Sequence, residues 1–248
     1  LSRLGVKSAI VGTIGDDKDG QTVLEIFSRE GVDTSGVSIQ HGATSGSVIV
    51  AAKSESTRAI STRQPVSQVK PNESAKKLAA NSKWVHVDHV GINLLPDLGI
   101  TRGGSVKISF DAGYGVKDFD VSLVDLFAPN DKQIHERHPE LDLKAAVMKD
   151  AEQGRNLVVA TMGSKGSIGY SSELGFAEAP AIKTEIISTL GAGDVFHGAL
   201  LAQLIEGYPL DESLKRANIV AALSCRGLDG QSAIPTKSEL KKYLEGAK

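Results

Sequence analysis

Outside residues 37–63, short apolar runs alternate with longer stretches whose apolar positions recur every three or four residues. The short runs are typical of buried strands, and the longer stretches are typical of helices that bury one face. Strands are expected at 8–13, 84–90, 106–113, 126–130 and 156–163, and helices at 21–29, 73–80, 131–138 and 142–153. This alternation predicts an α/β fold with a doubly wound, mostly parallel sheet flanked by helices.

Residues 37–63 have a different pattern. Two β-like runs, SGSVIVAA and STRAISTR, flank the polar turn KSES, as expected for a hairpin inserted into an α/β chain. The pattern therefore predicts a core made of residues 1–36 and 64–248 and a small β lid at 37–63. The apolar side chains of Val48, Ile49 and Val50 need cover in so small a sheet. We expect a second copy of the chain to provide it, in a homodimer formed through the lid.

Composition narrows the classes of function. A chain of 248 residues suits one large domain or a domain with a small appendage. The net charge of −2 provides no positive field that would attract nucleic acid or an anionic membrane. No apolar run approaches the ~20 residues of a membrane-spanning helix. Cys225 is the single cysteine, which excludes an internal disulfide framework, fits a reducing compartment and predicts a cytoplasmic protein.

Polar residues and glycines gather where the expected strands end. They are Asp88, Asp111, Asn130 and the segment Thr161–Gly163. In a parallel sheet, ligands bind beyond the carboxyl ends of the strands. Asp88, His89 and Asp111 are therefore candidate substrate ligands. Turn and helix-cap roles for the two aspartates, and an ordinary polar role for His89, remain as alternatives.

The stretch ISTLGAGDVFHGALL places Gly191, Ala192 and Gly193 directly before a helix that is expected to begin at Asp194. A helix N-terminus carries unpaired N–H groups and a partial positive charge, and small residues let a phosphate approach the backbone. The aspartate would repel a resting anion, but it suits a hydroxyl that loses its proton beside a phosphate. The stretch is thus interpreted as a phosphoryl-transfer site. A glycine turn followed by an N-cap aspartate explains the same sequence equally well, and the local pattern does not distinguish a phosphoryl-transfer site from an ordinary helix cap.

This stretch resembles the C-terminal signature of the PfkB (ribokinase-like) carbohydrate kinases, Asp-Thr-x-Gly-Ala-Gly-Asp, with Ser188 in place of the first Asp. Other segments resemble the family in the same order along the chain: VGTIGDDKDG, GVDTSGV, APND, ATMGSKG, RANIVAALSCRG and AIPT. The resemblance implies a ribokinase-like fold in which residues 37–63 form a β lid over the sugar. The first strand of the family and its Gly-Gly-x-x-x-Asn segment would precede Leu1, so an N-terminally incomplete chain is expected.

The resemblance also implies an activity, the ATP-dependent phosphorylation of a sugar hydroxyl, as in ribokinases, fructokinases and ketohexokinases. ATP and Mg²⁺ would be required. Asp194 would be the catalytic base, and Gly191, Ala192 and Gly193 would form an anion hole. The residues expected to lie along ATP are Asn130, Thr161, Gly163, Gly166 and, near the adenine, Asn218. No direct metal ligand is expected, and Asn130 would position Mg²⁺ through water.

Three departures from the family pattern affect these expectations. Gln133 stands where the family often has Glu, which removes a charge near the magnesium. Ser188 removes a carboxylate that some members associate with a monovalent cation, so the potassium requirement stays open. Asp229 and Gln231 stand where Gly and Arg are more usual.

Each implied role has a structural alternative. Asn130 would cap the next helix, Gly163 and Gly166 would be turn glycines, and Asn218 would be an exposed helix residue. Among functions, the alternatives are a nucleoside kinase, a sugar-phosphate kinase and a non-catalytic nucleotide or sugar sensor. Residues 37–63 contain no Phe, Tyr or Trp on which a nucleobase would stack, which favours a sugar. No grouping of His and Cys along the chain has the spacing of a zinc site.

Overall fold

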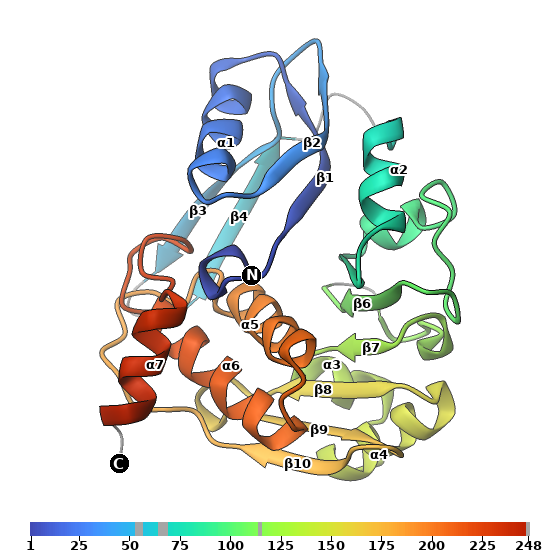
Figure 1. The fold of residues 1–248 in the computed structure, drawn as a ribbon. Coiled ribbons are helices and arrows are strands. Elements are labelled where there is room, and N and C mark those ends of the chain that lie inside the picture. Colours follow the sequence, from blue (N-terminus) through green and yellow to red (C-terminus); the bar gives the residue numbers. More distant parts are fainter. Residues whose placement is uncertain (53–56, 64–68, 114–115, 247–248) are drawn as a thin grey trace. The chain divides into compact units, whose positions relative to one another are not determined.

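The computed structural model describes all residues except 53–56, 64–68, 114–115 and 247–248. The described chain divides into two compact units. Unit 1 comprises Leu1–Val6, Ser82–Leu95 and Ile100–Lys248, and unit 2 comprises Lys7–Asn81 and Pro96–Gly99. Both units are drawn in Figure 1.

The sheet of unit 1 has six strands in the order β10-β9-β8-β7-β6-β5. Their bounds are β5 (Trp84–Val87), β6 (Lys107–Asp111), β7 (Leu126–Ala128), β8 (Leu157–Thr161), β9 (Ser167–Ser171) and β10 (Gly175–Ala179). Strands β5 to β8 pair in parallel, which confirms the predicted doubly wound α/β sheet. Strands β9 and β10 are antiparallel additions, because connections as short as residues 162–166 join only antiparallel neighbours.

Helices cover both faces of this sheet. They are α3 (Asp131–Arg137), α4 (Leu143–Gly154), α5 (Ala192–Glu206), α6 (Leu210–Ser224) and α7 (Lys237–Gly246). Figure 1 shows α5 and α6 on one face and α3 and α4 on the other. Helix α5 is buried along almost its whole central length, from Val195 to Gln203. Among the described residues, no helix is both long enough and apolar enough to cross a membrane.

A buried charge network joins α3 to α4. The Asp150 side chain is completely buried, and the Arg137 guanidinium donates to both of its carboxylate oxygens, at 2.9 and 3.0 Å. His138 Nε2 lies 2.9 Å from the same carboxylate. Arg137 also donates to the backbone carbonyls of Val116 and Phe119. A single carboxylate therefore holds together two helices and the loop before them.

Unit 2 contains β1 (Ala9–Gly15), α1 (Lys18–Arg29), β2 (Asp33–Gln40), β3 (Gly46–Ala52), β4 (Thr57–Arg63) and α2 (Glu73–Ala80). Strands β1 and β2 pair in parallel, and β3 and β4 form an antiparallel hairpin. The hairpin begins at Gly46, whereas the sequence analysis begins the lid at Val37. Residues 37–40 instead complete β2, where they pair with residues 12–15 of β1. The turn KSES lies outside the described residues.

The turn after β1 is tied to the segment that precedes the hairpin. Asp17 caps α1 by accepting from the Gly20 N–H, and it also accepts from the hydroxyl and the N–H of Thr44, at 2.5 and 3.0 Å. Gly15 lies against the Gly42 carbonyl so closely that no side chain fits there. These hydrogen bonds, with that of the Thr44 hydroxyl the largest cause, lower the pKa of Asp17 to about 2.

We expect Asp17→Asn to lower the thermal stability near neutral pH, with an effect that shrinks in acid. The ordinary pKa of this carboxyl is 3.8 and its folded-state pKa is about 2. The ionised form is therefore favoured by folding above pH 3.8, and its contribution is lost as the pH falls toward 2. Circular-dichroism melts of parent and variant across this range measure the effect. Asp19→Asn, on the same helical turn, is the control, and a melting difference that does not change with pH would contradict the assignment.

Candidate functional site

Helix α5 begins with an uncapped, glycine-lined N-terminus. Its N-cap is Gly191, with φ 73° and no side-chain hydrogen bond to the helix. Asp194 is the third residue of the helix, so the alternative that it is the N-cap is wrong. A Cβ on Gly193 would meet no atom within 4 Å, whereas a Cβ on Gly191 would lie 3.2 Å from the Cα of Gly230. Space for an anion is therefore open at Gly193, while Gly191 is fixed by a neighbouring loop.

One of the three amides expected in the anion hole is already engaged. The Ala192 N–H donates to the Thr189 carbonyl at 3.2 Å. The first N–H groups of a helix have no partner inside the helix, which leaves the amides of Gly193 and Asp194 as the donors nearest its start. An anion at this end would use these two amides or displace the bond of Ala192.

The surroundings of Asp194 favour its protonated form. Burial by neighbouring protein atoms, followed by the charge of Asp111, raises the pKa of Asp194, and His197 opposes this rise. Part of the residue is nevertheless exposed to solvent. A carboxylate whose pKa is raised binds a proton more strongly, and it is therefore a better general base.

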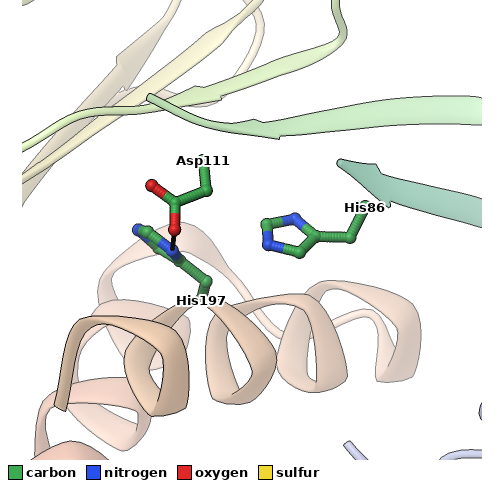
Figure 2. A group of neighbouring side chains, drawn as sticks. All are labelled: His86, Asp111 and His197. Atoms are coloured by element: carbon green, nitrogen blue, oxygen red, sulfur yellow. Dashed lines mark ion pairs between the residues drawn. The ribbon is translucent and has the colours of Figure 1, made fainter. Parts of the chain in front are cut away.

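Asp111 belongs to a cluster that the sequence analysis did not identify. It ends β6, and its Oδ2 lies 3.2 Å from Nδ1 of His197, one turn after Asp194 on α5. His86 on β5 completes the cluster, with its ring centre 5.7 Å from that of His197. Figure 2 shows the three side chains facing one another. The sequence analysis found no grouping of His and Cys with the spacing of a zinc site, and this cluster agrees with that, because its residues come from three separate elements and have no local spacing.

The charges within the cluster influence one another. Burial disfavours the ionised form of Asp111, but contact with His197 and the Gly113 N–H outweigh it and lower the pKa of Asp111. Crowding by protein atoms and the nearby His197 lower the pKa of His86 to about 4, although part of His86 is exposed. His86 is therefore neutral at pH 7. His197 was detectable in the sequence, because a residue three positions after Asp194 shares its helix face.

The other two candidate substrate ligands lie outside this cluster. The Asp88 carboxylate accepts from the N–H groups of Val90 and Gly91, at 3.0 and 2.6 Å, and so forms a turn after β5. The His89 ring lies close to Gly113, because a Cβ at Gly113 would be 3.2 Å from His89 Nδ1. The turn role given as the alternative for Asp88 is thus confirmed, while contacts of Asp88 and His89 with a substrate stay predictions.

Asn130 and Thr161 are adjacent at the ends of β7 and β8, where they form an isolated parallel bridge. Asn130 also caps α3, because its Oδ1 accepts from the Gln133 N–H at 3.0 Å. Gln133 completes a capping box by accepting from the Asn130 N–H at 2.8 Å, and it donates to the Gly113 carbonyl. The cap role of Asn130 is confirmed, and Gln133 is the second member of the same capping box. A role of Asn130 toward Mg²⁺ stays a prediction.

The two glycines after β8 differ in their surroundings. Gly163 has φ 57°, and a Cβ there would meet no atom within 4 Å. Gly166 has φ 107°, and a Cβ there would collide with the Ala179 carbonyl and come within 2.7 Å of the Ala181 nitrogen. Gly166 therefore has the structural role given as its alternative, whereas the space beside Gly163 is open to a ligand.

Asn218 is buried on α6, so the alternative that it is an exposed helix residue is wrong. Its Nδ2 donates to the carbonyls of Ala179 and Pro180, at 2.8 and 3.3 Å. These bonds attach α6 to the end of β10. Contact of Asn218 with the adenine stays a prediction.

Asp194 also borders a cavity of about 190 Å³. The cavity is lined by Leu1, Leu4, Asp194, Val195, Gly198, Ala199, Val220, Gly230 and Ile234. Asp194 has the one polar side chain in this lining. Because buried sugar hydroxyls need several hydrogen-bond partners, the cavity does not suit a sugar.

Comparison with known proteins places this chain in a family. The profile of the pfkB family carbohydrate kinases matches residues 1–99 and 120–237. The ribokinase of Haemophilus influenzae is 26% identical over 261 residues, which cover 99% of this chain and 84% of the relative.

Two solved structures are similar at the level of the fold. A protein from E. coli described as ribokinase II, in complex with ATP and Mg²⁺, has a TM-score of 0.83 at 19% identity. The alignment covers 99% of this chain and 85% of the E. coli chain. Arabidopsis thaliana ribokinase, complexed with ribose and ATP, has a TM-score of 0.82 at 20% identity, with coverages of 98% and 84%. The family profile matches most of the sequence, and the chain therefore belongs to the pfkB family of carbohydrate kinases and has the ribokinase fold.

Proposed function

We propose that this carbohydrate kinase transfers the γ-phosphate of ATP to a hydroxyl group of a free sugar, with Asp194 as the base. The observation that carries the proposal is a carboxylate of raised pKa in the first turn of a helix whose N-terminus is open at Gly193. The ATP, Mg²⁺ and ribose found with the two similar structures support the same classes of ligand for this chain.

The described residues fit such ligands. The open space at Gly193 and at Gly163 suits phosphate groups that approach the backbone. Asn130 and Thr161 lie together at the ends of two neighbouring strands, and Thr161 precedes Gly163 by two residues. Asn130 Oδ1 accepts one hydrogen bond and has a second lone pair for a water bound to Mg²⁺. When bound, ATP with Mg²⁺ supplies the phosphoryl group and neutralises part of its charge.

The work of the protein in this reaction is positioning and electrostatics. The Asp194 carboxylate accepts the proton of the attacking hydroxyl, and its raised pKa strengthens it for that task. The amides of Gly193 and Asp194, together with the partial positive charge of the helix start, stabilise negative charge on the transferred group. The carboxylate and these amides belong to the same helical turn, so the backbone itself fixes their separation.

A coupled ADP-release assay tests the proposal. The acceptors are pentoses, hexoses and ketoses, with sugar phosphates and nucleosides as the competing classes. We expect ADP formation that depends on one free sugar and on Mg²⁺. ADP release that depends on a nucleoside or a sugar phosphate would instead assign one of the related kinases. Binding of ATP without turnover on any acceptor would indicate a non-catalytic relative.

We expect Gly163→Val to weaken ATP binding by about tenfold or more, equivalent to about 1.4 kcal/mol, because the side chain would enter the open space beside the phosphates. Gly175→Val is a matched control, since Gly175 also has a positive φ and open surroundings but lies at the start of β10. Isothermal titration calorimetry on the folded variants measures both affinities. An unchanged ATP affinity in Gly163→Val would show that the phosphates lie elsewhere.

We further propose that the β3–β4 hairpin pairs with a second copy of the chain. Val48 and Val50 point to the same face of the hairpin and are 67% and 64% exposed. Exposed apolar side chains of this kind favour association. We expect the parent to be a dimer in light scattering and Val48→Ser/Val50→Ser to be a monomer. A parent that is monomeric at high concentration would contradict the pairing.

A further inference from the structure

Two histidines and an aspartate converge within unit 1 from elements that are far apart in the sequence. His86 lies on β5, Asp111 ends β6, and His197 lies on α5. One potential ligand atom from each side chain lies within 4.8 Å of the other two. In Figure 2 the His86 ring and the Asp111 carboxylate both point toward the His197 ring.

His197 is the unusual member of the cluster. It is only 6% exposed, and in the described part of the chain neither of its ring nitrogens makes a hydrogen bond. Its Nδ1 lies 3.2 Å from the Asp111 carboxylate, but without the alignment of a hydrogen bond. Among the described residues, Nε2 therefore has neither a hydrogen bond nor an ion pair, and a buried polar atom in this state is costly, so this nitrogen calls for a ligand.

His86 is oriented as a metal ligand would be. Its Nδ1 lies 3.0 Å from the Ser109 hydroxyl, which leaves Nε2 as the nitrogen available to the cluster. Histidines that bind metals commonly hold their second ring nitrogen in this way, because the hydrogen bond fixes the tautomer and the ring orientation.

We propose that His86, Asp111 and His197 form a binding site for one divalent transition-metal ion of the Zn²⁺ class. Two imidazoles and one carboxylate are the ligands that Zn²⁺ and similar ions prefer, whereas Mg²⁺ prefers oxygen ligands. Three protein ligands leave a fourth position of a tetrahedral ion open to water or another small ligand.

The required adjustment is small. Two ligand atoms of a tetrahedral zinc ion lie about 3.3 Å apart, because each is about 2.0–2.1 Å from the ion. The observed upper limit is 4.8 Å, so closing the site needs a movement of up to about 1.5 Å. His86 can provide it, because part of the residue is exposed to solvent.

This site does not include Asn130, the residue expected to position Mg²⁺ through water, and it lies beside the proposed base. Asp111 and His197 are the two charged neighbours that shift the pKa of Asp194. The simpler explanation of the cluster is an Asp111–His197 ion pair without a metal. That explanation gives His86 no part, and it therefore differs from the metal site in what the loss of His86 should do.

The experiment uses the full chain, freed of metals with a chelator and titrated with Co²⁺ as a spectroscopic probe, followed by competition with Zn²⁺. We expect a single equivalent of Co²⁺ to produce visible absorption bands that Zn²⁺ removes. His86→Ala and His197→Ala should each weaken binding by at least about tenfold, the loss that even residues supporting a metal ligand commonly cause. His135→Ala, which removes a surface histidine outside the cluster, should bind as the parent does.

A thermal melt provides the second measurement, because an ion that binds the native state raises the melting temperature. Zn²⁺ should stabilise the parent and His135→Ala but not His86→Ala. Because part of His86 is exposed, its replacement should leave the fold intact, which circular dichroism checks. Absence of Co²⁺ binding by the parent, or equal binding by the parent and His86→Ala, would overturn the proposal. Neither measurement uses kinase activity, so the metal site and the proposed reaction can fail independently.

Discussion

Asp194→Asn is expected to lower the turnover number by about 10²–10⁴-fold, equivalent to roughly 3–5 kcal/mol of activation free energy, while ATP binding is retained. The substitution keeps the size of the side chain and removes the group proposed to accept the proton. Helix α5 should form as before, because its N-cap is Gly191 and the Asp194 side chain does not cap it. The measurement is the turnover number of the folded variant at saturating ATP and sugar.

Asp211→Asn is the matched control for this experiment. Asp211 is exposed in the first turn of α6, so its replacement removes the same charge from the first turn of another helix. Any effect of the charge on helix stability should be shared by the two variants. The loss of turnover should be confined to Asp194→Asn, and a turnover number within about threefold of the parent would exclude Asp194 as the base.

The second large effect is expected in the core. Asp150→Ala should lower the free energy of unfolding by about 3–5 kcal/mol, because removal of one partner leaves a buried charge without compensation. The Arg137 side chain is 6% exposed and would lose both of its hydrogen bonds to the carboxylate. Urea unfolding followed by the fluorescence of Trp84, the single tryptophan, reports on the unit that contains this network.

Glu140→Ala provides the comparison for a surface ion pair. Glu140 lies 3.2 Å from Lys149, and both side chains are about half exposed. Such pairs contribute little to the free energy of unfolding, because solvent screens the charges and both side chains lose conformational freedom on pairing. If Asp150→Ala and Glu140→Ala shift the urea midpoint equally, the buried network does not stabilise the fold as described.

The elements with a strong periodic pattern could be predicted from the sequence. The expected helix at 73–80 coincides with α2, and the expected strands of the main sheet lie within one to a few residues of β5 to β8. The start of the hairpin was not predictable, because residues 37–40 have a β pattern that does not say which strand they pair with. Their partner is β1, about 25 residues earlier in the chain.

The candidate site was predictable only where its residues are neighbours in the sequence. The glycines before Asp194 and the cap role of Asn130 depend on spacings of a few residues, and local reasoning included both, although it did not identify Gln133 as the second member of the capping box. The cluster around Asp111 depends on three elements that meet only in the folded sheet. The burial of Asn218 likewise follows from the packing of α6 against β9 and β10, which no local pattern records.

Helix α5 places the proposed base, Asp194, at the accessible end of a segment that is otherwise enclosed by the core. We expect amides in the enclosed part, such as those of Leu200 and Leu201, to exchange their hydrogens only when the whole unit opens, because these residues are buried. The first turn at Gly191–Asp194 can open by local fraying alone. The carboxylate is thus attached to a segment that we expect to exchange most slowly, while the amides beside it can adjust to what they bind.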